Sequence, residues 1–387
     1  MGLLRGDGPL AGVIRSKAPN PATLEQETPM AVRLDHWRTR SEYVVMPLGA
    51  LLVSALLFSL FLWALGKSPA DFFALIWRGG FGTWFSIQNA LLRAAPLILT
   101  ALCVALPARL GLVIIGGEGA LVIGGLACAI VALPVAGVWP GWAVMVLMAL
   151  VAALAGGVWI GIIGALRAFR GVNETIAGLL MAYIAVAILN FSVEGPFRDP
   201  ASQNKPSTFP LPPEAMVGPI PGLEVHWGLI VGALLCLGFY VLIDHTTVGF
   251  AARVTGGNMR AAKAQGLPVG KLIIGFSMLA GAAAGLAGFF EVAAIHGRAN
   301  ASLAAGYGFT GILVAFLARH NPLAILPVAL LFGGIAASGG LIQRRMGLPD
   351  ATVLLMQGVI FVTLLASETL YGRLPFFRPA DQRSAAR

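Results

Sequence analysis

A polar, basic segment divides two long apolar runs in the second half of the chain: GFAARVTGGNMRAAKAQGLPVGK, residues 249–271. The run before it is Trp227–Ile243 and the run after it is Leu272–Ile295, and each is apolar enough to cross a membrane as a helix. The charges of a short basic helix between two such spans exclude it from lipid. We therefore expect this segment at the cytoplasmic surface of the membrane, where it can press against another protein.

The composition of the whole chain also indicates an integral membrane protein. Apolar residues make up 58% of the chain and charged residues 11%, with a mean hydropathy of +0.84. A soluble domain has too little interior to bury this much apolar surface. Only helices and closed barrels satisfy their backbone in lipid, and the apolar runs here do not alternate as barrel strands do. We expect an all-α, polytopic membrane helix bundle of about 10 transmembrane helices, some of them broken or half helices.

Apolar runs and their polar boundaries divide the chain into a transmembrane region and two tails. Residues 1–42 are expected to form a largely disordered cytoplasmic tail, residues 43–371 the transmembrane domain, and residues 372–387 a second cytoplasmic tail. The expected spans, in order, are 43–65, 88–108, 110–133, 141–166, 175–192, 227–243, 272–295, 307–318, 323–341 and 352–371. The run at 307–318 is short enough to be a half-helix.

The distribution of Lys and Arg predicts which side of the membrane each loop faces. With the N-terminus inside, 18 of the 26 Lys and Arg residues fall in cytoplasmic segments and 7 in external ones, so we expect both termini in the cytoplasm. The formal net charge of +9 then reflects basic cytoplasmic loops, which is a simpler reading than nucleic-acid binding. Arg344 and Arg345 fall on the outer side. Either a span near residues 300–350 is miscounted, or this pair faces a protein-lined cavity.

The longest external segment, residues 193–226, is rich in proline and contains four acidic residues. An extended, proline-rich cap at the outer surface fits a docking surface for a soluble partner. A structural lid or a plain connector explains the same composition equally well.

The chain lacks the common catalytic and metal-binding motifs. It contains no G-x-x-x-x-G-K-[ST] loop, so we expect no nucleotide hydrolysis by a P-loop of its own. It also contains no H-E-x-x-H or G-x-S-x-G motif and no Cys/His cluster, so no catalytic residue, metal site or bound cofactor is expected. Cys103, Cys128 and Cys236 lie inside apolar runs and are interpreted as small core residues.

One carboxylate interrupts an early apolar run, in the sequence Ile115-Gly-Gly-Glu-Gly119. Glycines around an ionisable residue can unwind a helix and expose backbone groups to a substrate. Alternatively, Glu118 lies at a helix end and accepts hydrogen bonds from backbone N–H groups, which makes it structural. Asn190 is a second polar residue in an apolar setting. The candidate substrate-pathway residues are Gly116, Gly117, Glu118, Gly119 and Asn190.

Three stretches together resemble a known family of membrane proteins. The first is Ile115–Gly119, the second begins with Asn173-Glu174 and runs to Tyr183-Ile184, and the third joins the basic segment from Gly249 to the glycine- and alanine-rich run ending at Gly288. Their order and spacing resemble the permease subunits of bacterial ABC importers of nucleosides and simple sugars, within the wider ribose and branched-chain amino-acid permease group. The likeness covers roughly residues 45–370.

The resemblance implies a transport subunit and not an enzyme. Two permease subunits, identical or different, would form the pore, a cytoplasmic subunit would bind and hydrolyse ATP with Mg²⁺, and an extracytoplasmic lipoprotein would deliver the solute. The chain would lie in the bacterial inner (plasma) membrane, with residues 43–371 as its permease domain and residues 244–271 as its cytoplasmic coupling loop. The residues implied in ATPase coupling are Arg253, Gly257, Asn258, Arg260, Ala261, Ala262 and Gly266.

This chain departs from the family pattern at three positions, where it has Ile114, Ala120 and Ala182 in place of amide side chains. Fewer amides leave fewer partners for the hydroxyls of a sugar. A nucleoside or purine-like solute is therefore expected ahead of a free sugar, and Phe276, Phe289 and Phe290 could stack its planar ring or simply pack. The rival functions are an ion-coupled secondary transporter, for which the chain has few paired intramembrane charges, and a passive channel, which needs no coupling helix.

Overall fold

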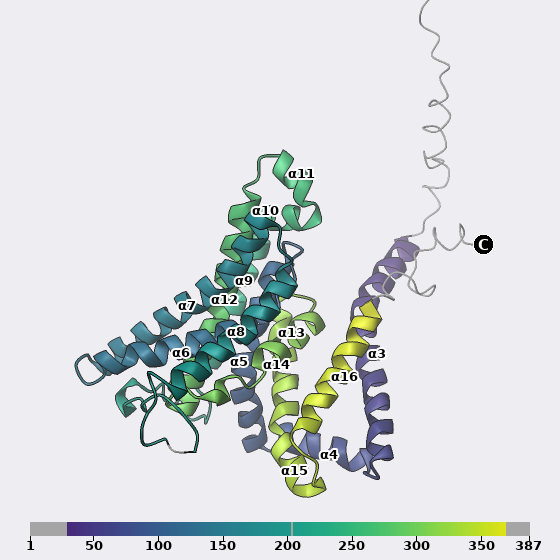
Figure 1. Ribbon diagram of the computed structural model, residues 1–387. Helices are drawn as coiled ribbons and strands as arrows, with labels where there is room; N and C mark the ends of the chain where they lie inside the picture. Colours follow the sequence, from purple (N-terminus) through teal and green to yellow (C-terminus); the bar gives the residue numbers. More distant parts are fainter. Residues whose placement is uncertain (1–28, 203, 369–387) are drawn as a thin grey trace, which may run out of the picture. The chain divides into compact units, whose positions relative to one another are not determined.

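The computed structural model describes residues 29–202 and 204–368 (Figure 1). The chain divides into two units, one spanning Leu57–Phe361 and one formed by the two ends of the chain, of which residues 29–56 and 362–368 are described and helical. In the described residues the regular structure is helical throughout, apart from two isolated β-bridges. The expectation of an all-α membrane bundle is confirmed.

Eight helices in the described residues are long and apolar enough to cross a membrane, and two shorter apolar segments, Ala301–Leu317 and Ala351–Ser367, accompany them. The helices, in chain order, are α3 (Pro29–Ala64), α4 (Pro69–Gly80), α5 (Trp84–Ala108), α6 (Gly117–Val135), α7 (Gly141–Arg170), α8 (Glu174–Glu194), α9 (Gly228–His245), α10 (Thr247–Gly257), α11 (Met259–Ala264), α12 (Val269–Phe290), α13 (Tyr307–Leu317), α14 (Pro322–Ala337), α15 (Gly339–Met346) and α16 (Ala351–Glu368). A π-helical turn, Glu291–His296, continues α12, and 3₁₀ turns occupy Pro213–Ala215 and Ala301–Leu303.

Several expected boundaries are corrected by the structure. The expected tail 1–42 is helical from Pro29 onward, because Pro at the first helical position favours a helix start and no glycine or proline follows before Pro47. Residues 1–28 and the expected tail 372–387 lie outside the described residues. The expected span 110–133 begins as helix only at Gly117, since residues 112–116 are not helical. The expected external loop 66–87 contains the helix α4.

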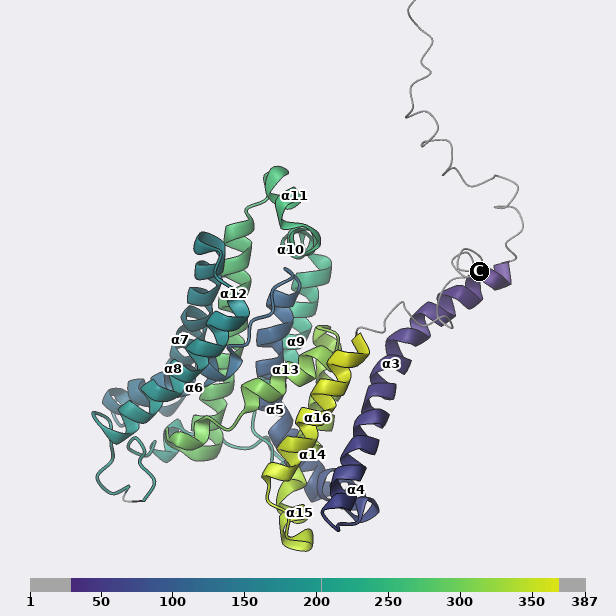
Figure 2. The same cartoon turned by 45° about the vertical axis from the view of Figure 1, so that its right-hand side comes forward.

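The core of the larger unit is built where α6, α7 and α12 cross at glycines (Figure 2). A side chain at Gly156 of α7 would strike Gly281 and Gly285 of α12, and one at Gly288 of α12 would strike the backbone of Leu121 in α6. Small residues allow such close approach of helices in lipid, where van der Waals packing drives association. Gly281 and Gly285, which are four residues apart in the sequence, therefore lie at a helix contact.

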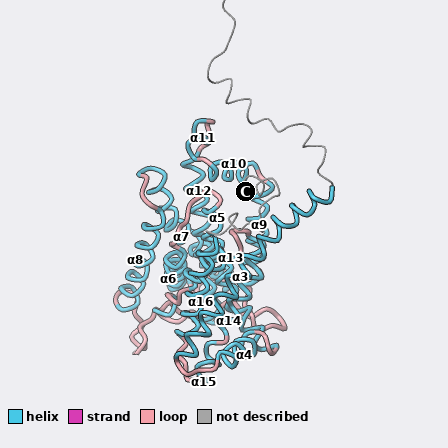
Figure 3. Tube along the Cα trace, turned by 90° about the vertical axis from the view of Figure 1, so that its right-hand side faces the viewer, coloured by secondary structure: helices cyan, strands magenta, loops and turns pink. Residues whose placement is uncertain are grey.

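The connecting segments of the larger unit gather at two opposite ends (Figure 3). At one end lie α10 and α11, and at the other lie α4, α15 and the loop after α8. Contacts within each end agree with this grouping. The turn around Arg109 lies against Gly256 of α10, and Arg109 donates from Nη2 to the carbonyl oxygen of His320 at 3.0 Å. At the other end, Lys67 donates from Nζ to the carbonyl oxygen of Met346 at 2.8 Å.

Candidate functional site

Glu118 joins the first turns of two helices in the interior of the larger unit. Its carboxylate accepts the backbone N–H of Gly306 at Oε1 (2.7 Å) and that of Gly308 at Oε2 (2.6 Å), and its side chain is buried. These contacts agree with the alternative in which Glu118 lies at a helix end and accepts backbone N–H groups. Glu118 lies in the first turn of α6 and binds the start of α13. With 11 residues, α13 is about 16 Å long, which is about half of a hydrocarbon core of about 30 Å.

The glycines beside Glu118 each face a different neighbour. A side chain at Gly116 would strike Ile160 of α7, and one at Gly119 would approach Ala182 of α8 within 2.9 Å. A Cβ added at Gly117 would lie 3.8 Å from the Cα of Gly308 in α13. The glycines thus bring α7, α8 and α13 against the start of α6.

A cavity of about 320 Å³ opens beside this junction. We call it the junction cavity, and it is lined by Glu118, Ala182, Tyr183, Val186, Ala304, Ala305, Gly306 and Phe309. Its wall is mainly apolar, and Glu118 is the one acidic side chain among the lining residues. Asn190 is half-buried and lies seven residues after Tyr183, which places it on the same face of α8 about 10 Å further along. The structure therefore brings Glu118 and the cavity together and leaves Asn190 two turns away.

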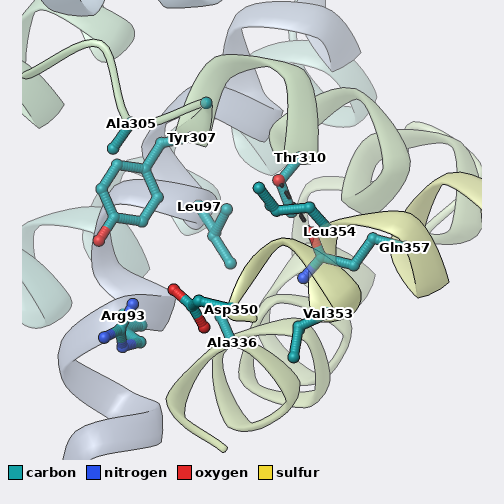
Figure 4. Close-up of a pocket in the computed structure, with 11 residues that line it drawn as sticks. Arg93, Leu97, Ala305, Tyr307, Thr310, Ala336, Asp350, Val353, Leu354 and Gln357 are labelled. Carbon is teal, nitrogen blue, oxygen red and sulfur yellow. Dashed lines mark hydrogen bonds between the residues drawn. The ribbon is translucent and has the colours of Figure 1, made fainter. Parts of the chain in front are cut away.

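A second cavity, of about 170 Å³, shares the lining residues Ala305 and Gly306 with the first (Figure 4). This polar cavity is lined by Arg93, Leu97, Ala305, Gly306, Tyr307, Thr310, Ala336, Asp350, Val353, Leu354 and Gln357. Figure 4 shows the charged ends of Arg93 and Asp350 and the hydroxyl of Tyr307 converging on it. Thr310 donates from Oγ1 to Oε1 of Gln357 at 3.3 Å. The cavity offers both donors and acceptors to a polar solute.

The aromatic residues suggested by the sequence are not at either cavity. Phe276, Phe289 and Phe290 are at most 5% exposed, and Phe290 stacks on the ring of His226 with centroids 5.5 Å apart. The aromatic side chains at the junction cavity are those of Tyr183 and Phe309 instead. Sequence reasoning missed them because both lie in uniformly apolar helices, where only the partner helix decides which face borders a cavity.

The basic segment folds into two helices joined by one extended residue, Asn258. Its Oδ1 accepts the N–H groups of Arg260 (3.0 Å) and Ala261 (3.1 Å), which caps the start of α11. Gly266 has a φ of +82°, and the N–H of Leu267 bonds the carbonyl oxygen of Ala262 at 3.1 Å, so α11 ends in a left-handed glycine cap. The expected short helix with a glycine end is confirmed; the preceding helix α10, which carries Arg253 and ends at Gly257, was not foreseen.

The side chains of the basic segment divide into an outward and an inward set. Arg260, Ala261 and Lys263 are exposed, whereas Ala262 is fully buried. Gly257 is exposed at the end of α10, with open space where a side chain would lie. Arg253 is held by an ion pair, from Nη1 to Oδ1 of Asp244 in α9 at 2.8 Å. An available surface therefore remains on α11, and Arg253 fixes α10 to the helix before it.

The inner side of α10 rests on the turn around Arg109. A side chain at Gly256 would strike the carbonyl oxygen of Arg109, so the two backbones are in contact. Arg109 in turn binds the backbone of His320. Burial lowers the pKa of His320 to about 4, and the positive charges of Arg109 and Arg319 act in the same direction. His320 is thus neutral at physiological pH, at a point where cations are concentrated.

The proline-rich segment 193–226 folds back on the far end of the unit. The N–H groups of Thr208, Leu211 and Val217 donate to the carbonyl oxygens of Ala299 (2.9 Å), Gly297 (2.7 Å) and Ala293 (2.9 Å), respectively. Of the two readings of its sequence, these bonds agree with a structural lid.

Comparison with known proteins identifies the family. Residues 86–365 match the family described as branched-chain amino acid transport system / permease component. The chain is 34% identical over 317 residues to the glucose ABC transporter permease protein TsgB13 of Haloferax volcanii, which covers 79% of this chain and 82% of that protein. It is 30% identical over 341 residues to the guanosine ABC transporter permease protein NupP of Bacillus subtilis, covering 85% and 94%. It is 24% identical over 350 residues to the nucleoside ABC transporter permease protein NupB of Lactococcus lactis subsp. cremoris, covering 87% and 94%.

The family excludes the two rival functions raised by the sequence, because its members are subunits of ATP-driven transporters that work with an ATP-binding subunit and a substrate-binding protein. The eight long apolar helices agree with a multi-pass membrane protein. The chain therefore belongs to the branched-chain amino acid transport system permease family and is the membrane-spanning permease subunit of an ABC importer of small solutes.

Proposed function

We propose that the junction cavity lies on the solute path and that the solute is a nucleoside or another compound with a planar base. The supporting observation is the pair of aromatic side chains at this cavity, Tyr183 and Phe309, which are 63% and 40% exposed. Aromatic faces stack on planar bases. The rest of the wall is mainly apolar and offers few hydrogen-bond partners. Both oxygens of Glu118 are already bonded to backbone N–H groups, so few partners remain for a polyhydroxylated ligand.

The test is uptake of labelled guanosine by cells that carry the complete transporter, with substitutions at Tyr183. Base stacking contributes about 1–3 kcal/mol, so Tyr183→Ala is expected to raise KM by at least about fivefold, and Tyr183→Phe is expected to retain affinity. Ile184→Ala is the matched control, because Ile184 is also exposed on α8 but does not line the cavity. Equal loss in the Tyr183→Ala and Ile184→Ala variants would contradict the proposal.

A free sugar is the second candidate solute, and the polar cavity favours it. Arg93, Asp350 and Gln357 offer the donors and acceptors that hydroxyl groups need, and one relative is named a glucose permease. If a sugar is the solute, Arg93→Gln abolishes labelled glucose uptake and Tyr183→Ala leaves it intact. Robust glucose uptake without competition by nucleosides would favour this candidate over the first.

The loop 244–271 is proposed to bind the cytoplasmic subunit that hydrolyses ATP with Mg²⁺, so that the permease itself needs no nucleotide site. Support comes from the exposed Arg260, Ala261 and Lys263 on a helix capped at both ends, which protrudes at one end of the larger unit (Figures 1 and 2). Ala261→Glu is expected to uncouple ATP hydrolysis from uptake in the assembled transporter. Ala201→Glu, the same change at an exposed site at the opposite end, is the control. Normal transport with Ala261→Glu would contradict this assignment.

Ala262, which was grouped with Ala261 in the coupling surface, is unsuited to that test. Its side chain is fully buried, so a charged substitution would disrupt the packing under α11 whatever its partner. Its proposed role is to seat α11, as Gly266 is proposed to end it and Arg253 to anchor α10.

The remaining features of the assembly follow from this orientation. The end with α10 and α11 faces the cytoplasm of a bacterial inner membrane, and both chain termini lie on that side. A second permease subunit completes the pore, and the substrate-binding lipoprotein approaches the opposite end, where the segment 193–226 lies.

A further inference from the structure

The helix α4 lies at the end of the larger unit opposite α10 and α11 and is too short to cross a membrane. Its 12 residues extend about 18 Å, against a hydrocarbon core of about 30 Å. It is amphipathic: Phe72 and Gly80 are buried, whereas Asp71, Trp77 and Arg78 are exposed. A helix of this kind lies in the plane of the membrane interface, with its polar face at the level of the lipid headgroups.

A pocket of about 460 Å³ lies along one face of α4. Ser68, Asp71 and Arg78 recur on this face at helical spacing, and Lys67 closes one end. The opposite wall comes from α15, through Arg345 and Met346, and Figures 1 and 2 both show α15 beside α4. The bond from Lys67 Nζ to the carbonyl oxygen of Met346, at 2.8 Å, ties the two walls together.

The pocket carries three basic side chains and one acidic one. Among the described residues, no carboxylate lies within ion-pair distance of Lys67, Arg78 or Arg345. Lys67 uses one donor on Met346, and the hydrogen bonds among the described residues leave the guanidinium groups of Arg78 and Arg345 available. Unpaired guanidinium forks around a cavity match the oxygens of a phosphate group.

Tryptophans mark the depth of this pocket. Trp77, which precedes Arg78 on α4, is 66% exposed, and Trp63, four residues before Lys67, is 75% exposed. Exposed tryptophans are enriched where acyl chains meet headgroups. We propose that the pocket binds the phosphate of an anionic phospholipid headgroup. An acidic soluble protein could meet the same cations, but it would leave both indole rings without the acyl-chain region that suits them.

The test is lipid binding by the purified full-length chain, measured by native mass spectrometry with phosphatidylglycerol, phosphatidylcholine and soluble glycerophosphoglycerol as separate probes. Phosphatidylglycerol should bind more tightly than phosphatidylcholine. A basic residue near a membrane surface contributes about fivefold to binding of anionic lipid, so Arg345→Gln should weaken it about fivefold and the pair Arg78→Gln with Arg345→Gln about 25-fold. Arg344→Gln is the matched control, since Arg344 neighbours Arg345 but does not line the pocket.

Four results would overturn the proposal. The first is equal binding of the two lipids, and the second is equal weakening by Arg344→Gln and Arg345→Gln. The third is binding of the soluble headgroup as tightly as the lipid, which would identify a site for free phosphate compounds. If lipid binding is unchanged in the Arg78 and Arg345 variants but the substrate-binding protein no longer associates, the pocket is a docking site for that partner. Thermal unfolding of each variant shows whether it is folded.

Discussion

At the scale of single residues, Glu118 connects two segments that lie far apart in the chain. It bonds Gly306 and Gly308, which follow it by 188 and 190 residues in the chain. A carboxylate near the N-termini of two helices is also stabilised by their dipoles, which direct partial positive charge toward it. Glu118, which the sequence marks as a carboxylate at a possible helix break, therefore stabilises the junction beside the cavity.

Replacing Glu118 with Gln is expected to weaken this junction. A carboxylate accepts at both oxygens, whereas an amide presents its NH₂ group to one of the two N–H donors and leaves it buried without a partner. We expect a loss of about 1–3 kcal/mol in unfolding free energy. Thermal unfolding in detergent measures it, with Glu214→Gln, at an exposed carboxylate, as the control. An unchanged midpoint for Glu118→Gln would show that the two bonds contribute nothing.

His320 is expected to make stability depend on pH. Its folded pKa is about 4, below the value of about 6.5 in an unfolded chain, so the unfolded state takes up a proton first as the pH falls. The neutral imidazole thus contributes stability above pH 6.5, and that contribution is lost as the pH falls from 6.5 toward 4. His320→Asn keeps the left-handed backbone (φ 57°) that Asn tolerates and removes the titrating group.

The measurement for His320 is the fall in melting midpoint between pH 7.5 and 5.0. His226, whose burial lowers its pKa to about 4, contributes in the same direction in both proteins, so the difference between them isolates His320. The fall should be smaller in His320→Asn than in the unchanged protein. Equal falls would contradict the assignment.

At the scale of helices, the start of α13 can lie directly against α6 because Gly308 has no side chain. A Cβ there would overlap the backbone of Glu118. We expect Gly308→Ala to separate the two helix starts, lower the yield of folded protein and reduce uptake at least tenfold. Gly275→Ala in α12 is the control, because a Cβ at Gly275 meets open space and alanine favours helix. Wild-type uptake by Gly308→Ala would exclude this account.

Local signals in the sequence predicted the helix ends well. Asn173 accepts from the N–H groups of Thr175 (3.0 Å) and Ile176 (3.1 Å) as an N-cap, as its position before an apolar run indicates. Asn258 caps the start of α11 in the same way, and Gly266 ends this helix in a left-handed conformation. The pairing of Glu118 with Gly308 was beyond prediction, since it joins segments far apart in the chain. The helix α4 was missed because 12 amphipathic residues are too few for a span and too polar for an apolar run.

At the scale of the whole molecule, the two ends of the larger unit are expected on opposite sides of the membrane. The exposed Lys263 on α11 and Lys205 in the proline-rich segment provide the test. In a chain without its three buried cysteines, Lys263→Cys should react with a membrane-impermeant maleimide only in inside-out vesicles, and Lys205→Cys only in right-side-out ones. Reaction of both sites from one side would overturn the topology.

The distribution of charge predicts this topology because the positive-inside rule acts on whole loops and tolerates errors in span edges. The exception that the sequence posed, Arg344 and Arg345, is resolved in part by packing: Arg345 lines a pocket with α4, while Arg344 faces outward. That outcome depends on how α15 lies beside α4, which no local pattern encodes.

The glycine contacts of α6, α7 and α12 also have a mechanical consequence. Where backbones touch directly, no layer of flexible side chains remains to absorb shear, so the three helices should respond to force as one stiff block. The turn after α11 leads straight into α12, whose 22 residues extend about 33 Å. A displacement of α11 should therefore reach the π-helical turn Glu291–His296 undiminished. In that turn the helical hydrogen-bond register changes, so it is the first place along α12 where we expect the backbone to bend.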